Sequence, residues 1–275
     1  MCIKKEFGRF YMSTGVYTTT KKDGSTSYRV SITYRRKHIS LGSYTDYEMA
    51  HSIYISGRNL VENPNITLED YNSNMNIPFN KFVCLINFRD NGLYFPNPIY
   101  LRKQYFEYYL SEHQVLKFDR DDLFFYASHK IQQRGGYLFV CDYGSQYKIL
   151  GRYGIKPFAV YGRDYIMANG DKNDYRYSNI KVINNYTGVT LHPDPVKDYY
   201  QATIHINGNY IIGRYDTENY AAIAYNKAVD ILHTNGLKKA YIKNYIPTIK
   251  REEYLHIYNN IEVSDKIINY KPDSN

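Results

Sequence analysis

Small or apolar residues alternate with polar ones from Tyr199 to His205, and a second such run extends from Tyr210 to Tyr215. This period of two predicts two strands of a sheet with one apolar and one polar face. Asn207 and Gly208 lie between the runs and predict a tight hairpin turn, because both residue types adopt the positive φ angles that such a turn requires. The polar positions of the first strand are Gln201, Thr203 and His205.

A pattern of helical period follows and ends at Asn235 and Gly236, residue types that commonly terminate helices. Thr217 and Glu218 predict a capped helix start. The apolar stripe is rich in alanine and comprises Ala221, Ala222, Tyr225, Ala228, Val229 and Leu232. Because small side chains let a helix lie close to a sheet, this helix is predicted to cover the apolar face and to leave the polar face for a ligand.

Residues 15–60 repeat this pattern, which indicates two copies of one module. The corresponding positions are Gly15-Val16 and Gly188-Val189, Tyr28 and Tyr200, Val30 and Ala202, Ile32 and Ile204, and Leu41-Gly42-Ser43-Tyr44 and Ile212-Gly213-Arg214-Tyr215. The first copy lacks the alanine pair and has one residue more between Tyr28 and Tyr44 than the second has between Tyr200 and Tyr215. Thr45 and Glu48 predict a capping box for its helix. The apolar face of that helix is formed by Met49, Ala50, Ile53, Tyr54 and Leu60.

The polar faces of the two modules supply the candidate binding residues. In the first copy these are Arg29, Ser31, Thr33, Arg35, Arg36, Lys37 and His38. In the second copy they are Gln201, Thr203, His205 and Arg214. Arg29 suits a guanine edge, whereas the cations at the turn suit phosphates. A solvated hairpin tip is the alternative interpretation of the first copy alone, and the recurrence of the module favours a reader with two parts.

The segments outside the modules are less informative. Residues 62–117 predict a folded spacer, because disordered chains contain few aromatic residues, and a short helix is predicted near Lys103 to Leu110. Residues 248–261 predict an amphipathic helix, with Ile249, Tyr254, Leu255, Tyr258 and Ile261 on its apolar face. Packing onto the body is the first interpretation of this helix, and a homodimer contact is the alternative. Residues 271–275 are predicted as a frayed end.

The central block, residues 118–186, contains a predicted helix from Asp119 to Gln133 and a predicted strand from Tyr137 to Cys141. Its most specific feature is the run Asn169-Gly170-Asp171, followed by Asp174, Arg176 and Asn179-Ile180. Asp164, Asp171 and Asp174 could hold a weakly bound magnesium ion, but carboxylates at Gly-Asp turns more often act as caps.

The second module resembles the DNA-binding domain of the plant ethylene-response-factor (Apetala-two) family. The resemblance is carried by Gly188-Val189, Tyr200, Ala202, Ile204, Ile212-Gly213, Tyr215, Thr217-Glu218, Ala221-Ala222 and Ala224-Tyr225-Asn226. It implies a three-stranded sheet that enters the major groove of DNA. Tyr200 stands in place of the family's tryptophan and is therefore a further candidate for a DNA contact. The central run resembles the ββα-metal loop of His-Asn-His homing nucleases, which in bacteria and phages occur beside related DNA-binding domains.

The catalytic residues of such nucleases are missing here. The resemblance places Met167 at the position of the general base, and a thioether cannot accept a proton. The upstream histidine corresponds to Gly151, and the helical context of His129 favours a surface or core position. A scaffold that has lost cleavage but kept DNA-facing residues is therefore implied. The candidates are Arg152, Lys172, Arg176 and Asn179, with Arg163 as a further basic residue. Alternatively, Arg176 and Asn179 only pin the loop to the helix that is expected to follow it.

Charge and composition refine this picture. The formal net charge is +8, and residues 1–60 carry ten Lys or Arg against four Asp or Glu, which predicts an anionic partner for the amino-terminal segment. The 34 tyrosines fit either an AT-rich genome or a contact surface. Three cysteines without paired spacing argue against a disulfide framework and a zinc ribbon. No run is typical of a signal peptide or a membrane span, which predicts a soluble cytoplasmic protein.

Together these patterns predict an α+β protein in which two modules, each a three-stranded antiparallel sheet plus one helix, flank a degenerate His-Asn-His-like domain. The expected boundaries are 1–66 for the first module, 67–117 for the spacer, 118–186 for the degenerate domain, 187–247 for the second module and 248–275 for the terminal helix and tail. The expected function is non-catalytic, sequence-specific binding of double-stranded DNA by a regulator of transcription or of a mobile element, without cofactor or metal. The alternatives are an active nicking endonuclease with unconventional metal ligands and a phage-type inhibitor that binds proteins.

Overall fold

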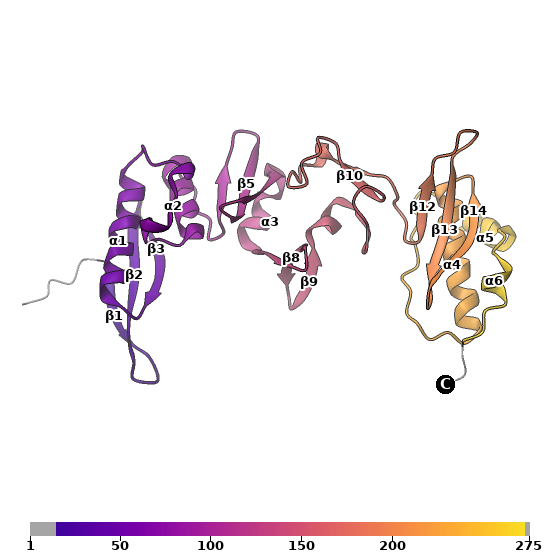
Figure 1. The fold of residues 1–275 in the computed structure, drawn as a ribbon, viewed down its shortest axis with the longest axis horizontal. Helices are drawn as coiled ribbons and strands as arrows, with labels where there is room; N and C mark the ends of the chain where they lie inside the picture. Colours follow the sequence, from indigo (N-terminus) through magenta and orange to yellow (C-terminus); the bar gives the residue numbers. More distant parts are fainter. Residues whose placement is uncertain (1–14, 273–275) are drawn as a thin grey trace, which may run out of the picture. The chain divides into compact units, whose positions relative to one another are not determined.

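A computed structural model describes residues 15–272 of the 275-residue chain, so the segment before Gly15 and residues 273–275 of the predicted frayed end lie outside the described residues. The described part is α+β, with six α-helices and several small antiparallel sheets (Figure 1). It divides into two compact units. One extends to Gln132 and includes Asn173–Arg176, and the other contains Gln133–Lys172 and the residues from Tyr177 onward. The division falls inside the central block.

The first module is a three-stranded antiparallel sheet with one helix packed on its apolar face (Figure 1). Its elements are β1 Val16–Thr20, β2 Thr26–Tyr34, β3 Lys37–Tyr44 and α1 Tyr47–Glu62. The central strand is β2. The buried residues shared by sheet and helix include Val30, Ile32, Ile39, Leu41, Ala50, Ile53 and Leu60. The predicted alternation therefore sets which face of the sheet is covered.

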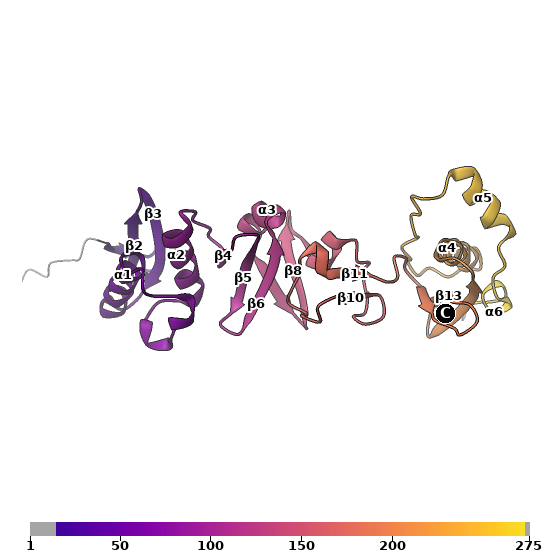
Figure 2. The same cartoon turned by 90° about the horizontal axis from the view of Figure 1, so that it is seen from above.

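The second module has the same arrangement. Its elements are β12 Val189–His192, β13 Tyr199–His205, β14 Asn209–Tyr215 and α4 Glu218–Thr234. In Figure 2, α4 is viewed nearly end-on and lies between the sheet and α5. The alanines of the predicted stripe, Ala221, Ala222 and Ala228, are each at 0% exposure. Small side chains thus let α4 pack close to the sheet, as the sequence predicted.

The two modules agree in detail, which confirms the repeat. In each, a β-bulge interrupts the pairing of the second and third strands. In the first module the bulge follows the pair Val30–Gly42, and in the second it follows the equivalent pair Ala202–Gly213. The extra residue of the first module lengthens its hairpin, where β2 and β3 stay paired up to a two-residue turn.

A glycine at the start of each module lies against a tyrosine of the helix. A Cβ atom on Gly15 would be 2.2 Å from the Tyr54 ring, and one on Gly188 would be 2.4 Å from the Tyr225 ring. Gly188 also has a φ of +73°, a conformation that favours glycine. The aligned Gly-Val positions therefore reflect a close contact between backbone and helix.

The helix starts correspond as well, with one correction. Thr217 caps α4 as predicted, and its hydroxyl accepts a hydrogen bond from the Tyr220 N–H at 3.2 Å. The capping box predicted at Thr45 is wrong, because the N-cap of α1 is Asp46, whose carboxylate accepts from the Met49 N–H at 2.7 Å. A carboxylate satisfies this N–H and also complements the helix dipole, so it is the stronger cap.

The hairpin turn of the second module differs from the tight turn that was predicted at Asn207 and Gly208. In the second module the turn is a three-residue loop between His205 and Asn209, and neither Asn207 nor Gly208 has a positive φ angle. The Lys239 ammonium donates to the carbonyl of His205 at 2.9 Å and so supports the loop from outside. A longer loop spreads the chain reversal over more residues, which removes the need for positive φ angles.

The helix predicted near Lys103 to Leu110 is wrong. This segment forms most of β5, the central strand of a sheet ordered β4-β5-β6. Phe106 and Tyr108 are 0% and 1% exposed and lie on one side of the strand, and a helix would point residues at this spacing to different sides. The elements of the spacer are η1 Leu68–Asp70, η2 Ser73–Met75, α2 Phe79–Asn91, β4 Ile99–Leu101, β5 Tyr105–Ser111 and β6 Gln114–Asp119.

The helix predicted from Asp119 to Gln133 is only partly correct. It consists of the single 3-10 turn η3, Arg120–Asp122, and the short helix α3, Leu123–Ser128, after which strand β7, Ile131–Arg134, begins. Ile131 is 2% exposed, and its N–H donates to the Tyr108 hydroxyl at 3.0 Å. This tertiary hydrogen bond holds the chain extended where the sequence pattern favoured a helix.

The rest of the central block is built of hairpins. Its elements are β8 Tyr137–Asp142, which confirms the predicted strand, β9 Ser145–Lys148, η4 Ile149–Tyr153, β10 Tyr165–Met167, η5 Tyr177–Asn179 and β11 Ile180–Val182. β10 and β11 pair antiparallel. The chain then passes from β11 to β12 without an α-helix. The helix expected after the loop on the ββα resemblance is therefore not formed.

The predicted amphipathic helix near the carboxyl end is α5, Arg251–Asn260, and it is followed by α6, Asp265–Ile268. Its apolar side faces α4: Ile257 is buried, and the Tyr258 hydroxyl donates to Asp230 at 2.8 Å. Leu255 remains 47% exposed. Packing onto the body is therefore the main role of this helix. In the described residues, no helix combines the length and the apolar character that a membrane span requires.

A substitution at the glycine contact tests this packing. Gly188→Ala should destabilise the second module by about 2 kcal/mol or more, because its methyl group would strain the backbone and lie 2.5 Å from the Thr203 carbonyl oxygen. Chemical denaturation followed by tyrosine fluorescence measures the loss. The control is Gly208→Ala, at a position with open space and an ordinary φ angle. Equal stability of the two variants would contradict the assigned contact.

Candidate nucleic-acid interface

The polar face of the second module lies opposite α4. Ala202 and Ile204 are 0% and 1% exposed against the helix, so the intervening side chains of β13 point to the other side. Gln201 lies in register with Arg214 of β14, and its amide donates to the Thr203 hydroxyl at 3.4 Å. The structure thus brings together four residues predicted from the sequence: Gln201, Thr203, His205 and Arg214.

One end of this face carries a stack of rings that sequence reasoning missed. The His192 and Tyr199 rings lie parallel, with centroids 5.2 Å apart and an interplanar angle of 4°. The Arg214 guanidinium carbon is 4.9 Å from the Tyr199 ring centroid. Tyr199 is two positions before Gln201 in the strand, so the two side chains point to the same face. This spacing is the signal that could have identified Tyr199. The stack restricts the Arg214 side chain and orients its donors.

Tyr200 does not belong to this face. It lies in register with Leu191 and Tyr215 and packs against the core of the second module. The equivalent Tyr28 packs against the core of the first module and contacts the Tyr47 ring. The alternation of the strand directs this ring toward the helix, so Tyr200 does not share the outer face with Gln201 and Thr203. The DNA contact that the resemblance implies for Tyr200 stays a prediction.

The polar face of the first module is centred on Arg29. Arg29 lies in register with Tyr17 on one side and Ser43 on the other, and Tyr17, another residue that sequence reasoning missed, is 54% exposed. Thr33 lies opposite His38, and its hydroxyl is 3.4 Å from the His38 ring Nδ1. Ser31 has the parity of this face but is only 6% exposed, so its predicted contact with a ligand is not available.

The three cations predicted at the turn do not play the same part. The Arg35 guanidinium donates to the Phe88 carbonyl at 3.3 Å, at the carboxyl end of α2, where a cation is favoured. The Lys37 ammonium lies 5.1 Å from the Tyr94 ring centroid. Arg36 is exposed and makes no hydrogen bond or ion pair within the described residues. Arg35 and Lys37 therefore fix the hairpin tip, and Arg36 is presented to solvent.

Two of the basic candidates in the central block are used internally. Arg163 donates to the carboxylate of Asp164, which is 1% exposed, and Arg176 donates to that of Asp174, which is 0% exposed. Asn179 is also buried, and its side-chain oxygen accepts from the Asn169 N–H at 2.8 Å. The interpretation that Arg176 and Asn179 pin the loop is thus supported. The exposed candidates in this block are Arg152, Arg163 and Lys172, and of these Arg163 is already committed to the Asp164 carboxylate.

The Asp164 carboxylate is the centre of a polar network. It also pairs with the Lys156 ammonium at 3.2 Å and accepts from the Val160 N–H at 2.8 Å. Burial alone would raise the pKa of Asp164, but the hydrogen bond from Arg163, with those from Val160 and Lys156, holds it below its ordinary value. This carboxylate is a structural counterion.

The residues that carry the resemblance to a nuclease loop have structural roles here. Met167, at the place of the general base, is 5% exposed and lies in β10. Asp164 and Asp174 are each committed to an arginine, so the carboxylates considered for magnesium do not converge. Within residues 15–272, no group of three or more His, Cys, Asp or Glu side chains is placed to hold a metal ion.

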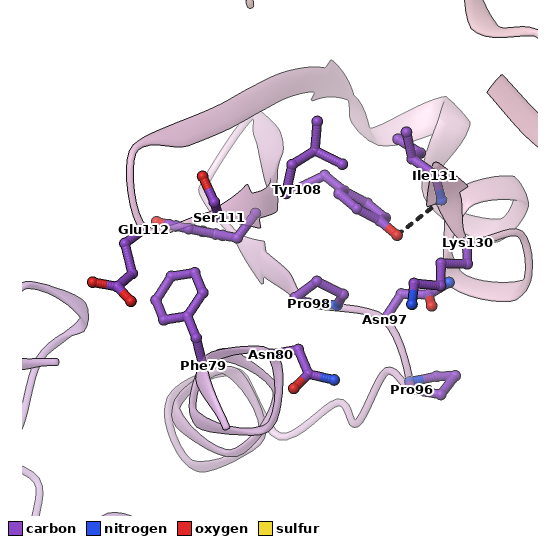
Figure 3. A pocket seen from close by; sticks show the side chains of 12 residues that line it. Phe79, Asn80, Pro96, Asn97, Pro98, Tyr108, Ser111, Glu112, Lys130 and Ile131 are labelled. Atoms are coloured by element: carbon purple, nitrogen blue, oxygen red, sulfur yellow. Dashed lines mark hydrogen bonds between the residues drawn. The ribbon is translucent and has the colours of Figure 1, made fainter. Parts of the chain in front are cut away.

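A cavity of about 370 Å³ lies in the first unit (Figure 3). Phe79 and Glu112 lie at one side of it and Lys130 at the other. Tyr108 lines the cavity, and burial raises its pKa to about 12. Its hydroxyl accepts from the Ile131 N–H, so this phenol serves the fold.

Comparisons with protein-family models, with curated proteins and with solved structures found no match for this chain. Its function is therefore inferred from the residues themselves.

The buried network predicts the effect of removing its charge. Asp164→Asn should destabilise the protein by about 3 kcal/mol, because Lys156 would be left partly buried without its counterion. Denaturant titration at neutral pH measures this loss. The control is Asp216→Asn, which removes an exposed ion pair with Lys197 and should cost less than about 1 kcal/mol.

The same network predicts a dependence on pH. The pKa of Asp164 lies below 3.8 in the folded protein, so its contribution to stability is present above this ordinary value and is lost as the pH falls through the lower folded pKa. The difference in stability between the native protein and Asp164→Asn should therefore shrink below pH 3.8. A constant difference across an acid titration of both proteins would contradict the assigned charge.

Proposed function

We propose that this chain is a non-catalytic, sequence-specific binder of double-stranded DNA that reads bases with the outer faces of its two sheets. The observation that carries the proposal is the recurrence of one construction: a helix covers one face of a three-stranded sheet, and the other face is polar and accessible in both modules. A polar outer face adds nothing to the apolar core of its module, so stability does not explain why this face occurs twice.

The chemistry of these faces suits base edges. The major groove admits β-structure, and its edges pair best with arginine on guanine and with glutamine on adenine. Arg29 lies at the centre of the first face, and Gln201 and Arg214 lie side by side on the second. Each face therefore offers at least one side chain that can make a bidentate contact.

Phosphate contacts come from the exposed cations around the first face. Arg36 extends from the hairpin tip that Arg35 and Lys37 hold in place. The excess of positive charge in residues 1–60 adds an electrostatic attraction that does not depend on sequence. Arg152 and Lys172 are the remaining candidates in the central block.

Two reading faces in one chain fit a regulator of transcription or of a mobile element, in line with the resemblance of the modules to a DNA-binding family. A nicking endonuclease is less well supported, because two of its three candidate carboxylates, Asp164 and Asp174, are paired with arginine side chains. Incubation of a plasmid that contains the target with magnesium or manganese distinguishes the two: metal-dependent nicking lost in Asp171→Ala would favour the nuclease.

Selection of bound sequences from random duplexes tests the proposal directly. A recovered motif is the expected result, and two half-sites would indicate that both faces read. Failure to enrich any motif, together with loss of binding at moderate salt, would favour a protein-interaction role instead.

Single variants separate the two kinds of contact. Arg29→Ala, and the double change of Gln201 and His205 to Ala, should each weaken discrimination at defined bases by about 1–3 kcal/mol. Arg36→Ala should weaken binding to all sequences alike and lower the salt slope by about 1. Fluorescence anisotropy with the selected and a scrambled duplex measures both effects.

The matched control for Arg36 is Arg58→Ala. Arg58 lies on α1, which packs on the other face of the same sheet, and pairs with Glu62. Its loss removes the same charge but should leave affinity nearly unchanged. Equal losses in the two variants would show that net charge alone, and not the outer face, determines affinity.

A further inference from the structure

A second surface, on the β8–β9 hairpin, gathers exposed aromatic rings around a lysine. Phe139 lies in register with Lys148, so Tyr137, Phe139 and Lys148 share one face of the hairpin. The Lys148 ammonium is 4.1 Å from the Tyr137 ring centroid and 5.3 Å from that of Phe158. Tyr137, Lys148 and Phe158 are called the Lys148 cluster below.

The rings of this cluster are exposed at a cost to the fold. Tyr137 is 56% and Phe158 83% exposed, so neither gains much from burial. Phe158 also has a φ of 64°, which costs on the order of 1–3 kcal/mol for a residue with a side chain. Tyr143, at the tip of the same hairpin, combines a φ of 45° with full exposure. A strained backbone that presents a large ring to solvent is typical of a binding site.

The charge around the cluster suits a polyanion. The Lys148 ammonium makes no ion pair or hydrogen bond within the described residues, so only the rings hold it. The Arg134 guanidinium lies 5.6 Å from the Phe139 ring centroid and adds a second cation on this sheet. Residues 133–172 contain six Lys or Arg against three Asp and no Glu. Aromatic rings interleaved with cations are the pattern with which proteins hold unpaired nucleotides.

We propose that the Lys148 cluster binds unpaired bases of single-stranded nucleic acid. The rings of Tyr137 and Phe158 stack on bases, and Lys148 and Arg134 contact the neighbouring phosphates. Every base has a π-face, so this binding tolerates sequence, whereas a duplex hides those faces within its own stack. The site therefore takes a form of nucleic acid that the outer faces of the two modules do not need, and it goes beyond the duplex reading proposed above.

Fluorescence anisotropy of the full-length protein with a labelled oligothymidylate tests the site. Tyr137→Ala and Phe158→Ala should each weaken binding by about fivefold or more, the loss of one stacked base. Tyr137→Phe keeps the ring and should bind like the native protein. An oligouridylate and a duplex with an unpaired bubble, used in parallel, show whether the unpaired bases are supplied by DNA, RNA or an opened duplex.

Phe124→Ala is the matched control, because Phe124 is 88% exposed on α3 and no cation from residues 15–272 lies over its ring. Phe158→Gly relieves the positive φ angle and should weaken binding without lowering the melting temperature, which separates a binding role from a structural one. Arg29→Ala should leave this binding intact, so failure here and failure of duplex reading are distinguishable. Unchanged oligothymidylate affinity in Tyr137→Ala and Phe158→Ala, or no affinity in the native protein, would overturn the proposal.

Discussion

The close contact between one helix and one sheet face is the interaction on which each module depends. A three-stranded sheet is too small to bury both faces, and burial of the isoleucines and valines of one face supplies its stability. The contact is close because Gly15 and Gly188 leave room for Tyr54 and Tyr225, where any Cβ atom would collide. Once the helix is in place, the other face has no part in the core and can carry polar residues without loss.

The partners of each basic side chain decide what it can do. Arg35, Arg163 and Arg176 bond to a helix end or to buried carboxylates, and removing them would disturb the fold first. Arg29 and Arg36 lie exposed on or beside the outer face. The count of positive charges was therefore a poor guide to the site, although the excess of charge in the amino-terminal segment still favours an anionic ligand.

Backbone strain is concentrated at exposed positions. Arg35 and Arg36 form a turn with φ angles of 46° and 64°, where Asn-Gly would be less strained. Tyr143 and Phe158 are aromatic residues that also have positive φ angles. In each case a side chain that could bind phosphate or base stands where glycine would stabilise the fold. The hairpin loop of the second module has no such strain, because neither Asn207 nor Gly208 has a positive φ angle.

Local patterns in the sequence determined the two modules. Period-two alternation identified the outer-face residues from Gln201 to His205, and the repeat was confirmed down to the bulges and the glycine contacts. These features are readable because they depend on near neighbours in the chain: strand parity, turn residues and helix caps. The same parity, applied consistently, would have placed Tyr200 in the core and Tyr199 on the face.

Tertiary structure decided the rest. The segment around Tyr105 became a strand because its alternate side chains fill a core formed by distant residues, and the helix expected up to Gln133 ended early because Ile131 bonds to Tyr108. Only the folded chain shows that Arg163 and Arg176 are paired with buried carboxylates, and that Tyr137 and Phe158 meet at Lys148. Asp164 and Asp174 are close to these arginines in the sequence, but their burial depends on segments far along the chain. Tyr137, Lys148 and Phe158 come from separate segments. No local period encodes either arrangement.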